Sequence, residues 1–170
     1  EWKVAHKDYD LPQEVYDFVK EEGFFSFIIP KEYGGLDFSP LGLIYVMAKV
    51  GSRSGTLASM VGVPNSLGPA ELLMHYGTDD QKSELLPKLA TGEHVPCFAL
   101  TGPYAGSDAT SMPDTGIVCK GEFEGEEIIG IKLNFSKRYI TLAPIATLIG
   151  LAFKMYDPDQ LIGETQNYGI

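Results

Sequence analysis

The stretch CFALTGPYAGSDAT, residues 97–110, concentrates side chains that can bind an anionic ligand. Thr101 and Ser107 offer hydroxyl groups that donate hydrogen bonds to phosphate or carbonyl oxygens. Gly106 has no Cβ, so its backbone can approach a ligand closely, and successive N–H groups in such a turn form an anion-binding nest. The pattern suits a phosphate, a diphosphate or the edge of a flavin. Taken alone, it fits an ordinary Gly-Pro turn with local side-chain hydrogen bonds better.

A second stretch, NFSKRYITLAP at 134–144, can present an aromatic ring beside a hydroxyl group. On a strand, Tyr139 and Thr141 face the same way because successive side chains alternate between the two faces. Such a pair suits a planar ligand. Lys137 and Arg138, which precede it, fit a solvated strand edge.

The residue spacing does not favour a metal site, a Ser-His-Asp triad or a nucleotide-binding loop. His94 and Cys97 have a His-x-x-Cys spacing, but no second ligand pair follows, so we expect no metal site. His94, Ser107 and Asp108 lie close in sequence, but no nucleophile elbow or oxyanion loop surrounds Ser107. The glycine spacing also differs from the phosphate-binding and dinucleotide-binding fingerprints.

The composition is typical of a soluble globular protein, with 44% hydrophobic and 21% charged residues among 170. A formal net charge of −10 and the lack of a Lys/Arg cluster argue against nucleic-acid binding. Cys97 and Cys119 are too few for a disulfide framework, which favours reduced thiols in a cytoplasmic protein. Any membrane association would come through segments outside this chain. Neither Glu1 nor Ile170 resembles a natural terminus, so we expect a piece of a longer protein.

The secondary structure predicted around the two stretches changes from helices to strands near residue 94. Before it, apolar residues recur at helical spacing. The predicted helices lie within 11–23, 40–55, 56–77 (two pieces split near Pro64) and from 78 onward, where Thr78 and Gln81 form a capping-box pattern. The helix within 40–55 is apolar on nearly every side, so we expect neighbours to pack all around it.

After residue 94, short runs rich in Val, Ile, Phe and Tyr lie between turn signals. The predicted strands lie within 95–100, 115–125, 127–137, 138–144 and 146–157, with a hairpin turn in GEFEGEE. The fold class is therefore α+β. We expect an N-terminal helical bundle domain over 1–94 and the first part of an antiparallel, barrel-like β domain over 95–170.

The two stretches together resemble the signatures of a known family. CFALTGPYAGSD, followed about thirty residues later by KRYIT, resembles the two signature stretches of the acyl-CoA dehydrogenases. IPKEYGGL, NSLGP and YGTDDQKSELLPKLATGE resemble the helical domain of the same family, and the resemblance runs in order over essentially the whole chain. KRYITLAPIATLIGLAFK is most similar to the large bacterial acyl-CoA dehydrogenases of fatty-acid β-oxidation.

This resemblance implies a helical domain, a β domain and a C-terminal helical domain, of which the last is absent from this chain. It also implies that FAD binds between the β domain and the C-terminal helices. The positions that it assigns to FAD are Phe98, Leu100, Thr101, Gly106, Ser107, Tyr139 and Thr141. Ser107 is also assigned to the acyl-CoA, whose fatty chain we place along Met60, Val63 and Leu67. These three apolar residues fit a plain hydrophobic core equally well.

The sequence departs from the family pattern at two positions. It also lacks the residue that acts as the catalytic base in the family. Gly102 stands where the family usually has Glu, and Tyr139 where it usually has Trp. The family's base is a Glu of the C-terminal domain, so no residue of this chain is assigned a catalytic role. Glu71 and Asp108 do not replace it, because no motif supports either.

The resemblance implies a parent enzyme that oxidises a fatty acyl-CoA to the trans-2-enoyl-CoA in β-oxidation. Its electrons are expected to pass to an electron-transfer flavoprotein, and the full-length enzyme is expected to form a homo-oligomer. The chain alone is expected to be inactive. The alternatives are an acyl-CoA oxidase or another flavin enzyme of the same fold, and a non-catalytic acyl-CoA or lipid-binding module.

Overall fold

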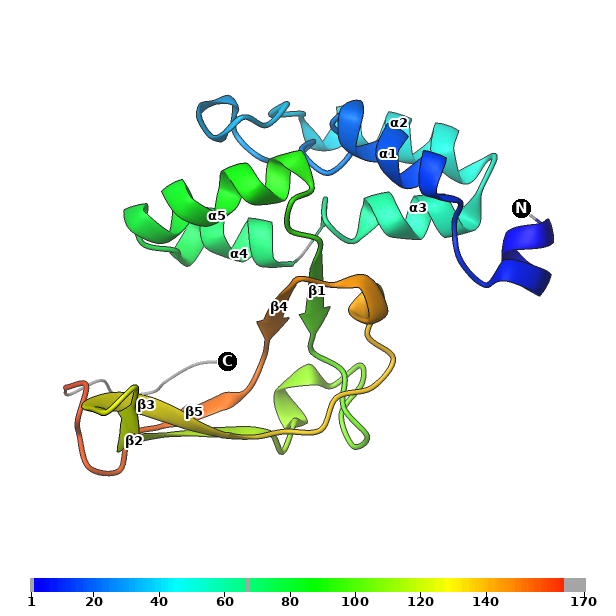
Figure 1. Ribbon diagram of the computed structural model, residues 1–170. Coiled ribbons are helices and arrows are strands. Elements are labelled where there is room, and N and C mark those ends of the chain that lie inside the picture. Colours follow the sequence, from blue (N-terminus) through cyan, green and yellow to red (C-terminus); the bar gives the residue numbers. More distant parts are fainter. Residues whose placement is uncertain (1, 67, 164–170) are drawn as a thin grey trace. The chain divides into compact units, whose positions relative to one another are not determined.

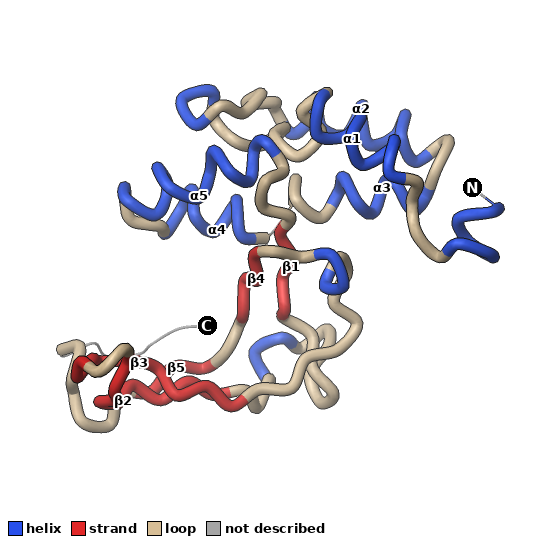
Figure 2. Tube along the Cα trace, in the orientation of Figure 1, coloured by secondary structure: helices blue, strands red, loops and turns tan. Residues whose placement is uncertain are grey.

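The computed structural model describes residues 2–66 and 68–163 of the chain (Figure 1). Contacts divide the chain into two compact units. The helical unit comprises Glu1–Phe98 and Thr141–Gly150, and the sheet unit comprises Ala99–Ile140 and Leu151–Ile170. Among the described residues every α-helix precedes every β-strand, so the predicted α+β class is confirmed (Figure 2). The domain limits 1–94 and 95–170 stay a prediction.

The α-helices of the helical unit follow the predicted order and have sequence-encoded ends. Thr78 Oγ1 accepts a hydrogen bond from Gln81 N at 3.2 Å, and Gln81 Oε1 accepts one from Thr78 N at 3.0 Å, which completes the capping box. Gly23 and Gly92 adopt positive φ after two of the helices. The α-helices are α1 Gln13–Glu21, α2 Pro40–Gly51, α3 Gly55–Gly62, α4 Pro69–Tyr76 and α5 Asp79–Thr91. Shorter helical turns are η1 Val4–Asp8, η2 Lys31–Tyr33, η3 Ala109–Ser111 and η4 Ala143–Ile145.

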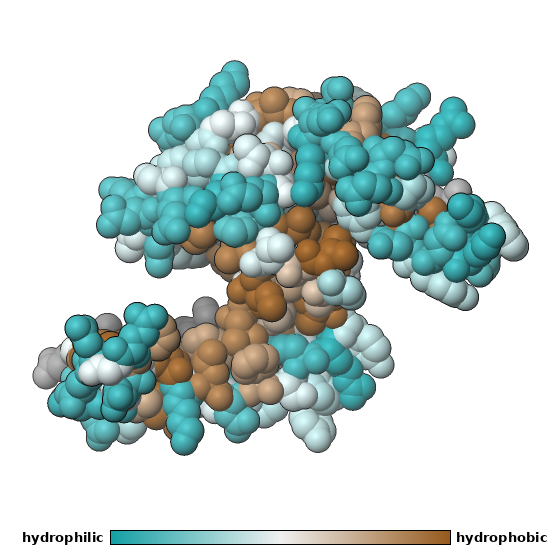
Figure 3. Space-filling model, in the orientation of Figure 1, coloured by the Kyte–Doolittle hydropathy of each residue, from teal (hydrophilic) through white to brown (hydrophobic). Residues whose placement is uncertain are grey.

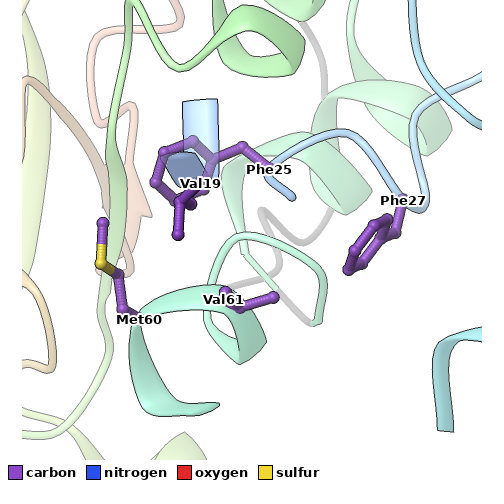
Figure 4. Close-up of a cluster of buried hydrophobic side chains, with 5 residues drawn as sticks. All are labelled: Val19, Phe25, Phe27, Met60 and Val61. Carbon is purple, nitrogen blue, oxygen red and sulfur yellow. The ribbon is translucent and has the colours of Figure 1, made fainter. Parts of the chain in front are cut away.

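Two clusters of buried side chains form the core of the helical unit. The first joins α1, the loop after it and α3, and it consists of Val19, Phe25, Phe27, Met60 and Val61 (Figure 4). The second joins that loop to α4 and α5 and consists of Ile29, Ala70, Leu86, Leu89 and Ala90. The loop over 24–29 therefore contributes to both clusters, which explains its unusually apolar sequence.

Helix α2 differs from its prediction. Leu43, Val46 and Met47 pack against the first cluster, but no residue of α2 is fully buried. Leu41, Ile44 and Tyr45 are exposed on another side of the helix. The expectation of neighbours on every side was therefore wrong for the part of the chain that the structure describes.

The strands are β1 Pro96–Ala99, β2 Thr115–Phe123, β3 Glu126–Asn134, β4 Leu148–Leu151 and β5 Lys154–Tyr156. β2 and β3 form the predicted antiparallel hairpin, in register from Thr115↔Asn134 to Phe123↔Glu126. Glu124 and Gly125 both have positive φ at the turn, as a two-residue type I′ hairpin requires. β5 pairs with β2 in parallel, so the sheet β3-β2-β5 is mixed rather than purely antiparallel. A parallel pair needs a long connection, and residues 124–153, which include β3 and β4, connect β2 to β5.

The strand predicted over 138–144 does not form, and this is a correction. The residues between β3 and the turn at Thr141 have no regular structure, and Tyr139 and Leu142 have φ of 58° and 68°. A left-handed residue interrupts an extended chain. Tyr139 and Thr141 are therefore not alternate residues of one strand. The run predicted over 146–157 is likewise two strands, β4 and β5.

No helix within 2–66 or 68–163 is long and apolar enough to cross a membrane.

Candidate functional site

Lys137 and Asp114 form a buried ion pair inside the sheet unit. Lys137 Nζ lies 2.7 Å from Asp114 Oδ2, and the two side chains are 5% and 2% exposed. Lys137 Nζ also donates to the carbonyl oxygen of Leu100 at 2.9 Å, and Ser136 N donates to Asp114 Oδ1 at 2.8 Å. The prediction that Lys137 lies on a solvated edge was wrong.

The pair also determines the charge state of its carboxyl group. Burial opposes ionisation and by itself raises the pKa of Asp114. The hydrogen bonds from Lys137 and Ser136, together with the charge of Lys137, outweigh that effect and hold the pKa below its ordinary value. Asp114 is therefore ionised opposite the Lys137 ammonium at neutral pH.

The two stretches singled out from the sequence lie against each other within the sheet unit. Arg138 N donates to the carbonyl oxygen of Thr101 at 3.1 Å, one residue along from the Lys137–Leu100 contact. A Cβ added to Gly102 would lie only 3.0 Å from the carbonyl oxygen of Ser136. The glycine at this departure from the family pattern therefore permits a close approach of the two backbones.

The predicted ligand-facing residues of the turn are accessible. Gly106 and Ser107 are exposed, and a Cβ added to Gly106 would meet no atom within 4 Å. Tyr139 is 84% exposed, with the guanidinium carbon of Arg138 at 5.3 Å from its ring centroid. Asp108 instead accepts hydrogen bonds from Ser111 and Thr110, which lower its pKa.

A separate pocket in the helical unit has a volume of about 300 Å³ and brings Met60 and Thr141 together. Leu11, Leu142 and Ile145 add apolar wall to it. Figure 3 shows apolar atoms (brown) gathered over the segment that contains η4 and β4, from which part of this wall comes.

Polar groups line another part of the same pocket. Tyr16 Oη donates to Asp10 Oδ1 at 2.7 Å, and both residues line the cavity. Burial, this hydrogen bond and the charge of Asp10 raise the pKa of Tyr16 to about 12, so its hydroxyl group stays neutral. The pocket therefore combines an apolar wall with a neutral phenol and a carboxylate.

The three positions predicted along a fatty chain have different surroundings. Met60 is 2% exposed and belongs to the first core cluster, yet it also lines the pocket, so it fits both readings of the sequence. Val63 is half-buried at the C-terminal end of α3. Leu67 lies outside the described residues.

The predicted site residues are distributed over both units. The helical unit contains Met60, Val63, Phe98 and Thr141, and the sheet unit contains Leu100, Thr101, Gly106, Ser107 and Tyr139. Phe98 is half-buried, and a Cβ added to Gly150 would lie 3.3 Å from its ring. Their roles toward FAD and acyl-CoA stay predictions.

Sequence reasoning missed Asp114 and misjudged Lys137. The available signal was weak, because a Pro-Asp dipeptide ordinarily marks a turn and a Lys beside an Arg is ordinarily solvated. Neither pattern reveals that the two side chains meet across 23 residues of sequence.

Comparison with known proteins establishes the family. Residues 1–93, more than half of the chain, match the acyl-CoA dehydrogenase, N-terminal domain. The chain belongs to the acyl-CoA dehydrogenase family, for which FAD is the typical cofactor, so the predicted family is confirmed. No cluster of His, Cys, Asp or Glu that could hold a metal ion occurs in the described ranges.

Three similar proteins show how much of this chain, and how much of each relative, the similarity covers. The 3-(aryl)acrylate reductase of Clostridium sporogenes (strain ATCC 15579) is 36% identical over 140 residues, which cover 82% of this chain and 35% of that protein. The caffeyl-CoA reductase-Etf complex subunit CarC of Acetobacterium woodii is 35% identical over 136 residues, covering 80% of this chain and 34% of that protein. The crystal structure of an acyl-CoA dehydrogenase complexed with FAD from Bacillus anthracis aligns with a TM-score of 0.69 at 31% identity, covering 81% of this chain and 23% of that one. The chain thus spans about a third of the length of these curated relatives.

Proposed function

We propose that this chain is the N-terminal part of an FAD-dependent acyl-CoA dehydrogenase and supplies one wall of its flavin and acyl-CoA site. The observation that carries the proposal is the contact between Leu100–Thr101 and Lys137–Arg138, which joins the two signature stretches of the family. The family makes the parent an oxidoreductase. The division into a helical domain over 1–94 and a partial β domain over 95–170 is part of the same proposal.

The residues of the turn and of the second stretch fit FAD. Open space at Gly106 leaves room for a ligand against the backbone, and the adjacent Ser107 hydroxyl is exposed. Tyr139 exposes an aromatic ring from a left-handed backbone position, which is costly for a residue with a Cβ. Strained positions of this kind cluster at ligand sites. This combination supports a planar, anionic ligand.

The chain would bind and orient rather than perform proton chemistry. When bound, FAD supplies an acceptor for the hydride that leaves the β carbon of the acyl group. Gly106 and Ser107 would hold the diphosphate through a backbone N–H and a hydroxyl group. Phe98, Leu100, Thr101, Tyr139 and Thr141 would line the ring system. The base that removes the α proton would lie outside this chain.

The acyl group would occupy the pocket that Met60 lines, with Val63 and Leu67 along the same path and Ser107 reaching the acyl-CoA. Apolar burial contributes about 0.8 kcal/mol per methylene, so such a wall suits a fatty chain. The product would be a trans-2-enoyl-CoA, as in β-oxidation. Membership of one relative in an Etf complex supports an electron-transfer flavoprotein as acceptor. We further propose a cytoplasmic homo-oligomer for the full-length protein.

A second candidate function is the reverse reaction on an aryl substrate. Two relatives are named as reductases, of 3-(aryl)acrylate and of caffeyl-CoA. The phenol of Tyr16 and the carboxylate of Asp10 would suit an acyl group with polar substituents better than a saturated chain. Reduction of the 2,3 double bond of such an acyl group is the activity that this candidate predicts.

The test uses the full-length protein that contains this chain, purified without added flavin. A dehydrogenase is expected to absorb at about 450 nm, as an oxidised flavin does, and to lose that absorption when a saturated acyl-CoA is added without oxygen. Peroxide release with oxygen indicates an oxidase instead. Turnover only of aryl-acrylyl substrates with a reductant favours the second candidate. A colourless protein that binds acyl-CoA indicates a non-catalytic module and contradicts the proposal.

A further inference from the structure

We propose that Lys137 and Asp114 are positioning residues, whose ion pair holds residues 100–101 and 136–139 in the arrangement that binds the flavin. The inference rests on the proposed function, because it takes FAD as the ligand. Neither side chain can touch a ligand in this arrangement, since only 5% of Lys137 and 2% of Asp114 is exposed. Any effect on a ligand must therefore pass through the backbone.

The contacts of the pair join three segments that are distant in sequence. Lys137 Nζ donates to Leu100 O at 2.9 Å and to Asp114 Oδ2 at 2.7 Å, and it lies 3.8 Å from Met112 Sδ. An ammonium group has three N–H donors, so this set of partners uses its whole capacity. Asp114 Oδ1 accepts from Ser136 N at 2.8 Å, which ties the carboxylate to the segment that carries the lysine.

The residues on either side of these contacts are those assigned to the flavin. Thr101 follows Leu100, and its carbonyl oxygen accepts from Arg138 N at 3.1 Å. Tyr139 comes two residues after Lys137 and adopts its left-handed φ of 58° at the end of this tether. A strained conformation persists only where surrounding contacts determine it. The Lys137–Asp114 ion pair and the Arg138 N–Thr101 O hydrogen bond hold the two residues that precede Tyr139.

A role in stability alone would not require this pair. Well-packed apolar side chains of similar volume often replace a buried ion pair without loss of stability, whereas removal of one partner leaves an unpaired buried charge. Apolar side chains, however, cannot bond to the Leu100 carbonyl oxygen or to Ser136 N. Replacing both partners with apolar side chains therefore tests whether the pair positions residues 100–101 and 136–139, with little change in folding stability.

The experiment compares full-length wild-type protein with the double variant Lys137→Met/Asp114→Leu. The matched control is Lys120→Met, which breaks the exposed pair between Lys120 Nζ and Glu127 Oε1, 3.2 Å apart on the hairpin of the same unit. The FAD dissociation constant and the visible circular dichroism of bound flavin are measured after far-ultraviolet circular dichroism has established folding. We expect the folded double variant to bind FAD about tenfold more weakly, the lower end of the loss that follows when the residue supporting a metal ligand is removed, and to show altered flavin dichroism. The control should match wild type in both.

The outcomes separate this inference from the proposed function. A folded double variant with wild-type FAD affinity and dichroism overturns the positioning role while leaving the proposed function intact. Wild-type protein that binds no flavin overturns both. If the double variant does not fold, Lys137→Arg replaces it, since it keeps the charge but changes the donor geometry. Faster amide exchange at Arg138 with weaker FAD binding in that variant supports the inference, and wild-type values of both overturn it.

Discussion

Two glycines of the sheet unit differ in the space that a Cβ atom would find. A Cβ at Gly106 would meet no atom within 4 Å, whereas a Cβ at Gly116 would overlap the ring of Phe153. Neither glycine has a positive φ. A glycine with free space that lies in the predicted diphosphate turn is suited to a function outside the chain's own packing.

Gly106→Ala is therefore expected to leave folding stability within about 1 kcal/mol of wild type, because the new methyl group meets nothing. FAD affinity should fall, because the same methyl group would stand against the diphosphate. Thermal unfolding without flavin and a flavin titration check the two parts. Gly116→Ala is the contrast, with an expected loss of about 1–3 kcal/mol from overpacking. Unchanged flavin affinity in Gly106→Ala would argue against the diphosphate assignment.

Asp114 predicts a pH dependence of stability with a definite sign. Its pKa is lowered in the folded chain, so the carboxylate stabilises the fold above its unfolded pKa of about 3.9 and loses that contribution as the pH falls through the folded value. Asp114→Asn should cost about 3–5 kcal/mol near neutral pH, because it leaves Lys137 buried without its counter-ion. Urea unfolding between pH 7 and pH 3 should show the gap between wild type and variant narrowing below about pH 4. A gap that stays constant contradicts this assignment.

At the scale of elements, Asn65 connects the end of α3 to the loop that feeds both core clusters. Its side chain is buried, and Nδ2 donates to the carbonyl oxygens of Phe24 at 2.6 Å and Val61 at 2.9 Å. Ile28 N donates to Oδ1 at 3.4 Å. The Asn of NSLGP therefore has a structural role, which its motif alone does not reveal.

Asn65→Ala should destabilise the chain by about 1–3 kcal/mol, because it leaves two carbonyl oxygens and an N–H group without their partner. Ser66→Ala is the neighbouring control, since Ser66 is exposed and its hydroxyl group donates to Val63 O, three residues away; it should change stability by no more than about 0.5 kcal/mol. Urea denaturation of both variants provides the comparison. Equal losses in the two would contradict the special role of Asn65.

At the scale of the whole molecule, both units expose apolar side chains within the described ranges. In the helical unit these include Leu41, Ile44 and Tyr45 of α2, and in the sheet unit Ile129 and Ile131 of β3. Contiguous exposed apolar surface promotes association in water. The 170-residue chain by itself should therefore be prone to self-association.

We expect the isolated chain to bind the dye ANS and to elute from a sizing column ahead of a monomer. Leu41→Glu/Ile44→Glu should reduce both effects, because it replaces apolar surface of α2 with charge. Lys49→Glu on the same helix is the control, since it shifts the net charge in the same direction without removing apolar surface. A monomeric wild-type chain that binds no dye contradicts the expectation.

Features that depend on neighbouring residues could be predicted from the amino-acid sequence. Thr78 and Gln81 predict the start of α5, the Glu124-Gly125 turn predicts the hairpin, and the ordered motifs predict the family; all three are confirmed. Three features became visible in the folded chain alone: the burial of Lys137 against Asp114, the parallel pairing of β5 and the left-handed backbone of Tyr139. The two groups of features differ in the sequence separation of the contacts that stabilise them. Caps and tight turns are stabilised within a few residues, whereas burial and strand pairing depend on contacts between segments far apart in the chain.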